Sequence, residues 1–311
     1  MIPFVSQLPR IEQALWLEAL NQVLANETIV LADDIPQEQR HLCKLAIVAN
    51  PEISTLKQFK NLHWLHSVWA GVEKLMESLP TSPINVVRLV DPMLSQTMAE
   101  AVLAWSLYLH RDMPTYAKQQ RKKQWQQQAY VPASERRIGI LGLGELGCAS
   151  AEQLSNVGFQ VLGWSRTAKT LAGVSTYSGI YGLANMVSQS DILVCLLPLT
   201  PATKDLVNKE FLYKMPKGSS LINFARGAII HSHDLLQALD DKQLSHAVLD
   251  VFEQEPLSSN SELWQHPNIT VLPHISAPTN MATACQIVAK NIIEYRATGQ
   301  LPECVDKVRG Y

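Results

Sequence analysis

The sequence lacks the features of several protein classes. Its five cysteines lie far apart and form no CxxC pair, which argues against a disulfide framework or a zinc site and is typical of a reducing compartment. The formal net charge is −2, so no nucleic-acid-binding surface is predicted. The most apolar run, residues 192–199, is too short to cross a bilayer, and polar residues interrupt the N-terminal segment, unlike a signal peptide. We therefore expect a cytoplasmic protein with no metal, no nucleic-acid partner and no membrane partner.

What the chain does contain is enough apolar sequence for two domains. It has 311 residues, of which 47% are hydrophobic, and this length exceeds that of one ordinary domain. Strand-like runs at 28–32, 45–49 and 86–90 alternate with helix-like segments such as 10–24. A second alternating block begins at Arg137, and its strand candidates are 138–141, 159–163, 192–197, 221–225, 247–252 and 269–272. This alternation predicts an α/β protein with parallel sheets, of which the second is a doubly wound, Rossmann-like sheet.

Two longer helices are predicted at residues 95–110 and 281–298. In the first, Met98, Val102, Trp105 and Leu109 are spaced four, three and four residues apart and form one apolar stripe. The stripe is interpreted either as packing on its own domain or as part of a dimer interface. The second helix ends near Gly299, a residue type that favours helix C-termini.

The segment GLGELG, residues 142–147, is a candidate dinucleotide site. It follows a strand-like run and opens a helix-like one, the context in which a GxGxxG motif becomes informative. Gly142 permits a tight turn, Gly144 lets the backbone approach a pyrophosphate, and Gly147 lets the helix pack close to the sheet. The pyrophosphate is then expected on free amides at the helix N-terminus.

The end of the next strand distinguishes between cofactors. An NAD site places an acidic residue about 20 residues after the glycine motif, to bind the ribose diol. Here the strand ends in the segment GWSRT, and no acidic residue occurs between Glu152 and Asp191. Arg166 can pair with a 2′-phosphate, and Ser165 and Thr167 offer hydroxyl groups. The sequence therefore predicts NADP(H) in preference to NAD(H).

Three polar motifs follow strand candidates of the second block. They are NFARG with Arg226, DVFEQEP with Asp250 and Glu255, and PHIS with His274. In open α/β sheets, ligands bind beyond the carboxyl ends of the strands, so these motifs are expected to face one crevice. A fourth motif, WAGVE at residues 69–73, joins a strand to a helix in the first block.

Together these motifs resemble the D-isomer-specific 2-hydroxyacid dehydrogenase family, and the likeness covers nearly the whole chain. It is closest to the glyoxylate/hydroxypyruvate reductase A branch, through GLGELG, GWSRT, LLPLTPAT, NFARG, LDVFEQEPL, LWQHPNITVLPHIS and the C-terminal VDKVRGY. The resemblance implies a Rossmann-like cofactor domain, residues 98–282, inserted into a flavodoxin-like substrate domain, residues 1–97 with 283–311. It also implies a homodimer whose interface helices open the cofactor domain.

The implied reaction is the NADPH-dependent reduction of a small 2-keto acid, such as glyoxylate or hydroxypyruvate, to the D-2-hydroxy acid. Arg226, Glu255 and His274 are the implied catalytic residues: Arg226 holds the keto acid through its planar fork of donors, His274 donates a proton, and Glu255 orients His274. Glu253 competes with Glu255 for the acidic role, but the family pattern places the acid just before Pro256. Backbone amides near residues 70–72 would bind the substrate carboxylate.

The full sets of implied binding residues are larger. For the substrate they are Trp69, Ala70, Gly71, Val72 and Arg226. For the cofactor they are Gly142, Gly144, Glu145, Leu146, Trp164, Ser165, Arg166, Thr167, Leu197, Pro198, Ala225, Arg226, Asp250 and His274.

The chain departs from the family pattern at two positions and leaves two alternatives open. Trp69 stands where the family usually has a small residue, and Glu73 stands where it has Asp, which puts the shape of the substrate pocket in question. One alternative is a formate- or phosphoglycerate-type dehydrogenase of the same architecture. The other is a cofactor-sensing binding protein that keeps the fold with little turnover; the intact set of Arg226, Glu255 and His274 argues against it.

Overall fold

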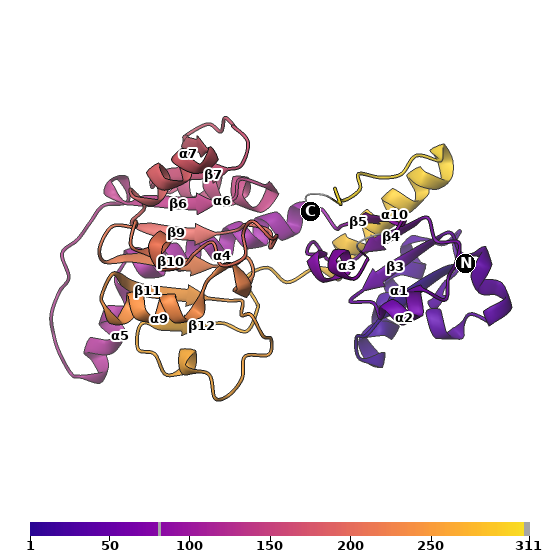
Figure 1. Ribbon diagram of the computed structural model, residues 1–311, viewed down its shortest axis with the longest axis horizontal. Helices are drawn as coiled ribbons and strands as arrows, with labels where there is room; N and C mark the ends of the chain where they lie inside the picture. The colour runs from indigo at the N-terminus through magenta and orange to yellow at the C-terminus, as the bar shows by residue number, and fades with distance from the viewer. Residues whose placement is uncertain (80–81, 308–311) are drawn as a thin grey trace. The chain divides into compact units, whose positions relative to one another are not determined.

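The computed structural model describes residues 1–79 and 82–307, and the chain divides into two compact units (Figure 1). The first unit is Met1–Met93 with Thr279–Tyr311, and the second is Leu94–Pro278. The chain therefore passes between units after residues 93 and 278, where the sequence predicted boundaries after 97 and 282. Residues 308–311, which belong to the predicted first domain and to the VDKVRGY motif, lie outside the described residues.

The first unit contains a five-stranded parallel sheet in the order β2-β1-β3-β4-β5. This strand order is the flavodoxin-like one. Its strands are β1 (Ile2–Ser6), β2 (Ile29–Leu31), β3 (Leu45–Ala49), β4 (Trp64–Ser67) and β5 (Asn85–Val87). Its helices are α1 (Arg10–Val23), α2 (Ile53–Leu56), α3 (Glu73–Ser78) and α10 (Met281–Thr298), with 3-10 turns at Ala32–Asp34 and Gln37–Leu42.

The last helix returns to the first unit and completes its core. Trp16 and Leu20 of α1 pack with Val288 and Ile292 of α10 in one buried cluster beside the sheet, and Figure 1 shows α10 next to the N-terminal strands. Gly299 ends the helix with φ 74°, the left-handed conformation that glycine adopts without strain. The bounds and the cap of this helix are those that the sequence predicted.

The second unit contains a seven-stranded parallel sheet in the order β12-β11-β10-β9-β6-β7-β8. The chain runs outward from β6 through β7 to β8, then returns to the centre at β9 and runs to the other edge. This is the Rossmann order with one added edge strand, and the order reverses between β6 and β9. The strands are β6 (Arg137–Leu141), β7 (Gln160–Ser165), β8 (Val174–Ser178), β9 (Ile192–Cys195), β10 (Ser219–Asn223), β11 (Leu244–Leu249) and β12 (Ile269–Val271).

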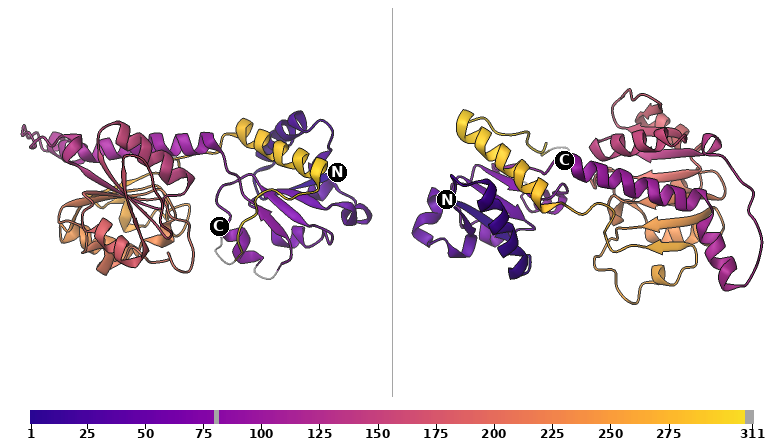
Figure 2. Two further views of the ribbon diagram at one scale, coloured as in Figure 1. Left: turned by 90° about the horizontal axis from the view of Figure 1, so that it is seen from above. Right: turned by 180° about the vertical axis from the view of Figure 1, so that it is seen from behind.

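Helices cover both faces of this second sheet, as the edge-on view in Figure 2 shows. One buried cluster joins the sheet to α4 and α6, and another joins it to α7, α8 and α9. The helices are α4 (Pro92–His110), α5 (Met113–Arg121), α6 (Glu145–Asn156), α7 (Gly179–Val187), α8 (Lys209–Leu212) and α9 (Ser232–Asp240). Three 3-10 turns lie at Ala133–Glu135, Gly227–Ile229 and Glu262–Trp264.

The predicted apolar stripe of α4 packs on the second unit. Met98, Val102 and Leu109 are buried in the cluster that contains β6 and β9, and Trp105 lies against it.

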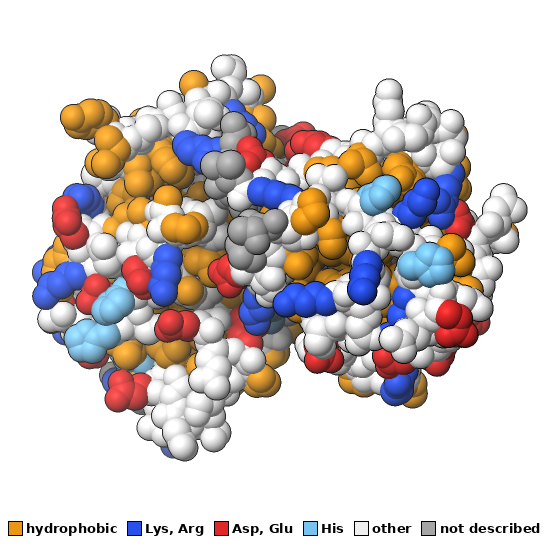
Figure 3. Space-filling model, turned by 45° about the vertical axis from the view of Figure 1, so that its right-hand side comes forward, with side chains coloured by type: hydrophobic (Ala, Val, Ile, Leu, Met, Phe, Trp, Pro, Cys, Tyr) orange, Lys and Arg blue, Asp and Glu red, His pale blue; other side chains and the backbone are white. Residues whose placement is uncertain are grey.

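Acidic and basic side chains are interspersed on the surface in Figure 3. Within residues 1–79 and 82–307, no helix is both long and apolar enough to span a membrane.

Candidate active site

The glycine motif forms a tight strand–turn–helix junction between β6 and α6. Gly142 has φ 102°, and its N–H donates to the Trp164 carbonyl across 2.9 Å. A Cβ on Gly147 would lie 1.8 Å from the Gly142 carbonyl oxygen, whereas a Cβ on Gly144 would meet no atom within 4 Å. Gly144 precedes the first residue of α6, Glu145, so open space adjoins the helix N-terminus. Such a junction fits a dinucleotide pyrophosphate, which binds to free amides at this kind of terminus.

Basic and hydroxyl side chains follow β7 beside this turn. Arg166 and Thr167 are exposed, while the Ser165 hydroxyl donates to the Thr167 carbonyl across 2.8 Å and shapes the loop. Lys169, which the sequence reasoning did not single out, donates from Nζ to the Leu143 carbonyl across 2.6 Å. Its ammonium group therefore lies at the glycine turn. A basic residue three positions after Arg166, in a segment without acids, was the signal that could have identified it.

The loop after β9 adjoins the glycine turn at the point where the strand order reverses, and the loop after β10 follows on the other side of β9. The Leu196 N–H donates to the Leu141 carbonyl across 2.9 Å, which places Leu197 and Pro198 directly beyond the centre of the sheet. Leu197 and Ala225 are buried. This edge is where open α/β sheets bind their ligands, so the predicted cofactor residues of these loops share one edge with the glycine motif.

Arg226 follows β10 in a loop held by a neighbouring side chain. The Asn223 amide donates to the Arg226 carbonyl across 3.1 Å, and its oxygen accepts the Ala225 N–H at 3.1 Å. The loop also touches the one after β11 without intervening side chains, because a Cβ on Gly227 would lie 1.9 Å from the Phe252 carbonyl carbon. The segments that carry Arg226 and Glu255 are thus packed backbone to backbone.

Glu255 and His274 form a hydrogen-bonded pair. His274 Nδ1 lies 2.8 Å from Glu255 Oε2, and Glu255 Oε1 accepts the Phe252 N–H at 2.9 Å. The His274 side chain is 53% exposed and that of Glu255 34%. Because Nδ1 faces a carboxylate, it carries the ring proton in this arrangement, and Nε2 is left to exchange a proton with a ligand. The pair has the geometry of an oriented general acid.

Asp250 fixes the turn on which His274 stands. Its side chain is buried, with 2% exposed, and its two oxygens accept the N–H groups of Ile275 at 2.7 Å and Ser276 at 2.8 Å. His274 itself has φ 55°, a left-handed conformation that costs free energy for a residue with a side chain. Two charge-assisted hydrogen bonds to the following residues help to hold it there.

The loop at residues 69–72 belongs to the first unit and follows β4. The Trp69 N–H donates to the Ser67 hydroxyl across 3.0 Å, and the Trp69 carbonyl accepts the Leu89 N–H at 3.1 Å. The Trp69 ring packs edge-on against Trp16, with centroids 5.7 Å apart, and lies against the core cluster shared with α10. The bulk of the indole is therefore taken up by packing within the first unit. Val72 is buried at the start of α3, and Ala70 and Gly71 are half-buried.

These features can be compared with known proteins. Residues 103–276 match the family described as "D-isomer specific 2-hydroxyacid dehydrogenase, NAD binding domain". The chain belongs to this family. Among solved structures, it is similar to a D-isomer specific 2-hydroxyacid dehydrogenase from Xanthobacter autotrophicus Py2 in complex with NADPH and MES. The identity is 36%, the TM-score is 0.92, and 99% of each chain is covered.

Two further relatives are similar over comparable lengths. One is an NADPH-dependent glyoxylate/hydroxypyruvate reductase from Sinorhizobium meliloti in complex with NADP and sulfate, with 30% identity, a TM-score of 0.89 and full coverage of both chains. The other is a probable 2-hydroxyacid dehydrogenase from Rhizobium etli CFN 42 in complex with NADP, HEPES and L(+)-tartaric acid, with 29% identity, a TM-score of 0.88 and 99% coverage of each chain. The predicted family and two-domain α/β fold are confirmed, and the protein is an NAD(P)-dependent oxidoreductase.

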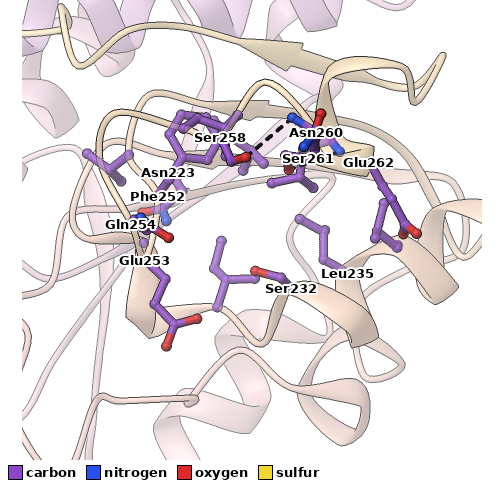
Figure 4. A pocket seen from close by; sticks show the side chains of 17 residues that line it. Asn223, Ser232, Leu235, Phe252, Glu253, Gln254, Ser258, Asn260, Ser261 and Glu262 are labelled. Atoms are coloured by element: carbon purple, nitrogen blue, oxygen red, sulfur yellow. Dashed lines mark hydrogen bonds between the residues drawn. The ribbon is translucent and has the colours of Figure 1, made fainter.

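This 2-hydroxyacid dehydrogenase also has a cavity of about 400 Å³ next to the loops after β10 and β11 (Figure 4). Asn223, Gly227, Phe252 and Glu253 line it, together with residues of α9 and of the 257–263 loop. The residues that line it do not include Arg226, Glu255 or His274. Over the described ranges 1–79 and 82–307, no group of three His, Cys, Asp or Glu side chains is placed to hold a metal ion.

Proposed function

We propose that this 2-hydroxyacid dehydrogenase reduces a small 2-keto acid of the glyoxylate/hydroxypyruvate class to the D-2-hydroxy acid, with NADPH as cofactor. The observation that carries the proposal is the Glu255–His274 pair on a turn anchored by Asp250, at the same carboxyl edge of the sheet as the glycine turn. A general acid is what the oxygen of a reduced carbonyl needs, because negative charge grows on that oxygen. When bound, the cofactor supplies the hydride that reduces the keto carbon.

Residues of the chain supply the proton and bind the substrate and the cofactor. His274 donates a proton from Nε2 to the keto oxygen, and Glu255 keeps the ring oriented for it. Arg226 binds the keto acid through its guanidinium, and the backbone of residues 70–72 binds the carboxylate from the first domain. The first unit is accordingly proposed as the substrate domain and the second as the cofactor domain. The cofactor is proposed to contact Gly142, Gly144, Glu145, Leu146, Trp164, Ser165, Arg166, Thr167, Leu197, Pro198, Ala225, Arg226, Asp250 and His274.

The preference for NADP rests on the positive charge after β7. Lys169 reaches the glycine turn, Arg166 precedes Lys169 by three residues in the same exposed segment, and no acidic residue occurs between residues 153 and 190 to oppose a 2′-phosphate. The relatives with NADPH or NADP in their structures support the same preference. Replacing both residues, Arg166→Gln with Lys169→Met, should raise the KM for NADPH by about 100-fold and leave the KM for NADH nearly unchanged. Equal changes for the two cofactors would contradict the preference.

NADPH oxidation at 340 nm with glyoxylate, hydroxypyruvate and pyruvate in parallel tests the proposed function. We expect rapid turnover with at least one of the first two, and its loss in His274→Ala while NADPH still binds. Turnover with NADH alone would overturn the cofactor proposal and keep the reaction. NADPH binding without turnover on any of the three would overturn the proposed reaction and favour a sensor that keeps the fold.

We also propose a homodimer formed through α4, α5 and the segment at 122–132. Trp125 is 99% exposed and Tyr130 74%, and two exposed aromatic rings within one short segment that follows the proposed interface helices are typical of an interaction surface. Light scattering should give the mass of two copies for the parent and a lower mass for Trp125→Lys. Tyr181→Lys, which alters an equally exposed ring on α7, is the matched control and should stay dimeric. A parent with the mass of one copy would refute the proposal.

A further inference from the structure

Arg88 follows β5 directly beside the loop proposed to bind the substrate carboxylate. β4 and β5 pair in register, with His66 opposite Val87, and the bond from the Leu89 N–H to the Trp69 carbonyl continues this pairing past the strand ends. Arg88 therefore lies in extended chain directly after β5, at the same edge of the sheet as residues 69–72, which follow β4; Figure 1 shows these two neighbouring strands. Its position is set by backbone pairing within one unit.

The alternation of burial shows on which face Arg88 lies. Val87 and Leu89 are buried in the cluster that Trp69 and α10 share, whereas Val86 is buried in the opposite cluster, with Val72 and Leu75. Because successive residues of an extended chain point to opposite faces, Arg88 lies on the face of Val86. That is the face of Val72 and α3, on which the loop ends.

The guanidinium of Arg88 has no partner among the described residues. Arg88 is only half exposed, yet none of the hydrogen bonds or ion pairs of residues 1–79 and 82–307 involves its side chain. A half-buried guanidinium without a counter-charge is disfavoured, and an external anion resolves this. Because the amides of residues 70–72, which are also proposed to bind an anion, lie at the same edge, one ligand carboxylate can accept from these amides and from Arg88.

We propose that Arg88 is a further guanidinium for the substrate, binding the carboxylate of the keto acid together with the amides of residues 70–72 of the same unit. The inference rests on the proposed function, because it needs an anionic substrate at residues 70–72. It assigns Arg88 to the selection of 2-keto acids over their neutral esters and amides. Arg88 strengthens ground-state binding and takes no part in proton transfer, so its loss acts on KM rather than on kcat.

Two variants and a matched control test the role of Arg88. Arg88→Gln removes the charge, Arg88→Lys keeps it without the planar fork, and Lys74→Gln removes an exposed charge on the neighbouring α3. For Arg88→Gln we expect the KM for glyoxylate and the Kd for oxalate, measured by calorimetry with NADPH present, to rise about 10- to 100-fold. We expect kcat, the Kd for NADPH and the melting temperature to stay near parent values. For Arg88→Lys, the KM and the Kd should lie between those of the parent and those of Arg88→Gln. For Lys74→Gln, both should match the parent.

A neutral substrate separates carboxylate binding from a general change in the pocket. The KM for methyl pyruvate should change less than about twofold in Arg88→Gln, because the ester offers no anion to the guanidinium. An unchanged KM for glyoxylate, an equal shift in Lys74→Gln, or an equal shift for methyl pyruvate would overturn the inference.

Failure of the inference is distinguishable from failure of the proposed function. If the parent reduces glyoxylate and Arg88→Gln behaves like the parent, only the inference fails. If the parent turns over no keto acid, the proposed function fails. The Kd for oxalate, compared between the parent and the variants, then still tests the role of Arg88. If the parent neither turns over a keto acid nor binds oxalate, both proposals are overturned.

Discussion

Glu253 and Glu255 show how much one residue's position matters in the loop after β11. Both carboxylates lie in the same exposed turn, but Glu255 alone contacts His274, at 2.8 Å, while its other oxygen accepts the Phe252 N–H. The sequence left both as candidates for the acidic role and favoured Glu255 on the family pattern. The hydrogen bonds supply a physical reason for that choice, because a carboxylate must reach the ring to orient it.

Glu255→Gln should therefore impair catalysis, and Glu253→Gln should not. An amide facing Nδ1 no longer accepts the ring proton with a full charge, so we expect kcat to fall by about 100-fold with little change in the Kd for NADPH. Steady-state kinetics with the preferred keto acid measures the first, and fluorescence titration of NADPH the second. Equal losses in the two variants would show that the negative charge of the loop matters rather than the contact with His274.

Asp250 offers a second prediction at the scale of a residue. Both of its oxygens accept main-chain N–H groups in a buried setting, so in Asp250→Asn the amide nitrogen must face one of these donors. A buried donor left without an acceptor costs about 1–3 kcal/mol, and the urea midpoint should fall accordingly. Glu253→Gln, at an exposed position of the same loop, should keep the parent midpoint. An unchanged midpoint in Asp250→Asn would mean that the His274 turn does not depend on this carboxylate.

At the scale of an element, the glycine turn contains two glycines, Gly144 and Gly147, that are glycine for different reasons. Gly147 has no room for a Cβ, which would lie 1.8 Å from the Gly142 carbonyl oxygen, whereas Gly144 has φ −78° and open space within 4 Å. Gly147→Ala should therefore destabilise the second unit by about 3 kcal/mol. Gly144→Ala should keep the parent's stability and still raise the Kd for NADPH about tenfold, since the methyl group occupies the approach of the pyrophosphate.

Thermal melting and NADPH titration of these two variants distinguish packing from ligand approach. The informative result is Gly144→Ala, because it alters no contact of the chain itself. If it binds NADPH as tightly as the parent does, the open space beside Gly144 is not where the pyrophosphate lies.

The elements that the sequence could and could not predict differ in how they are packed. Continuous apolar runs such as 45–49 and 192–195 became central strands, because strands covered on both faces are apolar throughout. The edge strand β8 was missed since its mixed burial leaves a polar sequence, VSTYS. β1 was missed as well; Pro3 argues against a strand, but it lies one residue before the pairing with β3 begins at Phe4.

The same distinction holds for the candidate site. Motifs with fixed local spacing, such as the glycine turn, could be predicted because one strand and one helix determine them. Contacts that depend on the chain returning could not: Lys169 reaches Leu143, and Asp250 reaches Ile275 and Ser276, across some 25 residues. The lack of a partner for Arg88 is likewise a property of the folded chain and leaves no mark in sequence spacing.

At the scale of the whole molecule, both units contain histidines that are buried and whose pKa burial lowers: His66 in the first unit, and His110 and His246 in the second. Burial lowers the pKa of His66, in the first unit, from 6.5 to about 4, against a smaller opposite effect of its bond to Ser67. Burial, with Lys118 and His266 nearby, lowers the pKa of His246 in the second unit to about 4. In the unfolded chain both rings titrate near 6.5, so the unfolded state binds more protons at any pH between these values.

Stability should therefore fall as the pH falls from about 6.5 towards 4, and each unit should contribute. Above pH 6.5 both rings are neutral in either state, and the loss develops only below it; between pH 7.5 and 5.0 each histidine accounts for about 2 kcal/mol. Urea midpoints at these two pH values, taken for the parent, His66→Gln and His246→Gln, measure the effect. Both variants start less stable at pH 7.5, but each should lose less on acidification than the parent, and His63→Gln, which removes an exposed ring, should lose as much as the parent. Parallel losses in all four proteins would mean that other groups carry the acid sensitivity and that these two rings accept protons without unfolding.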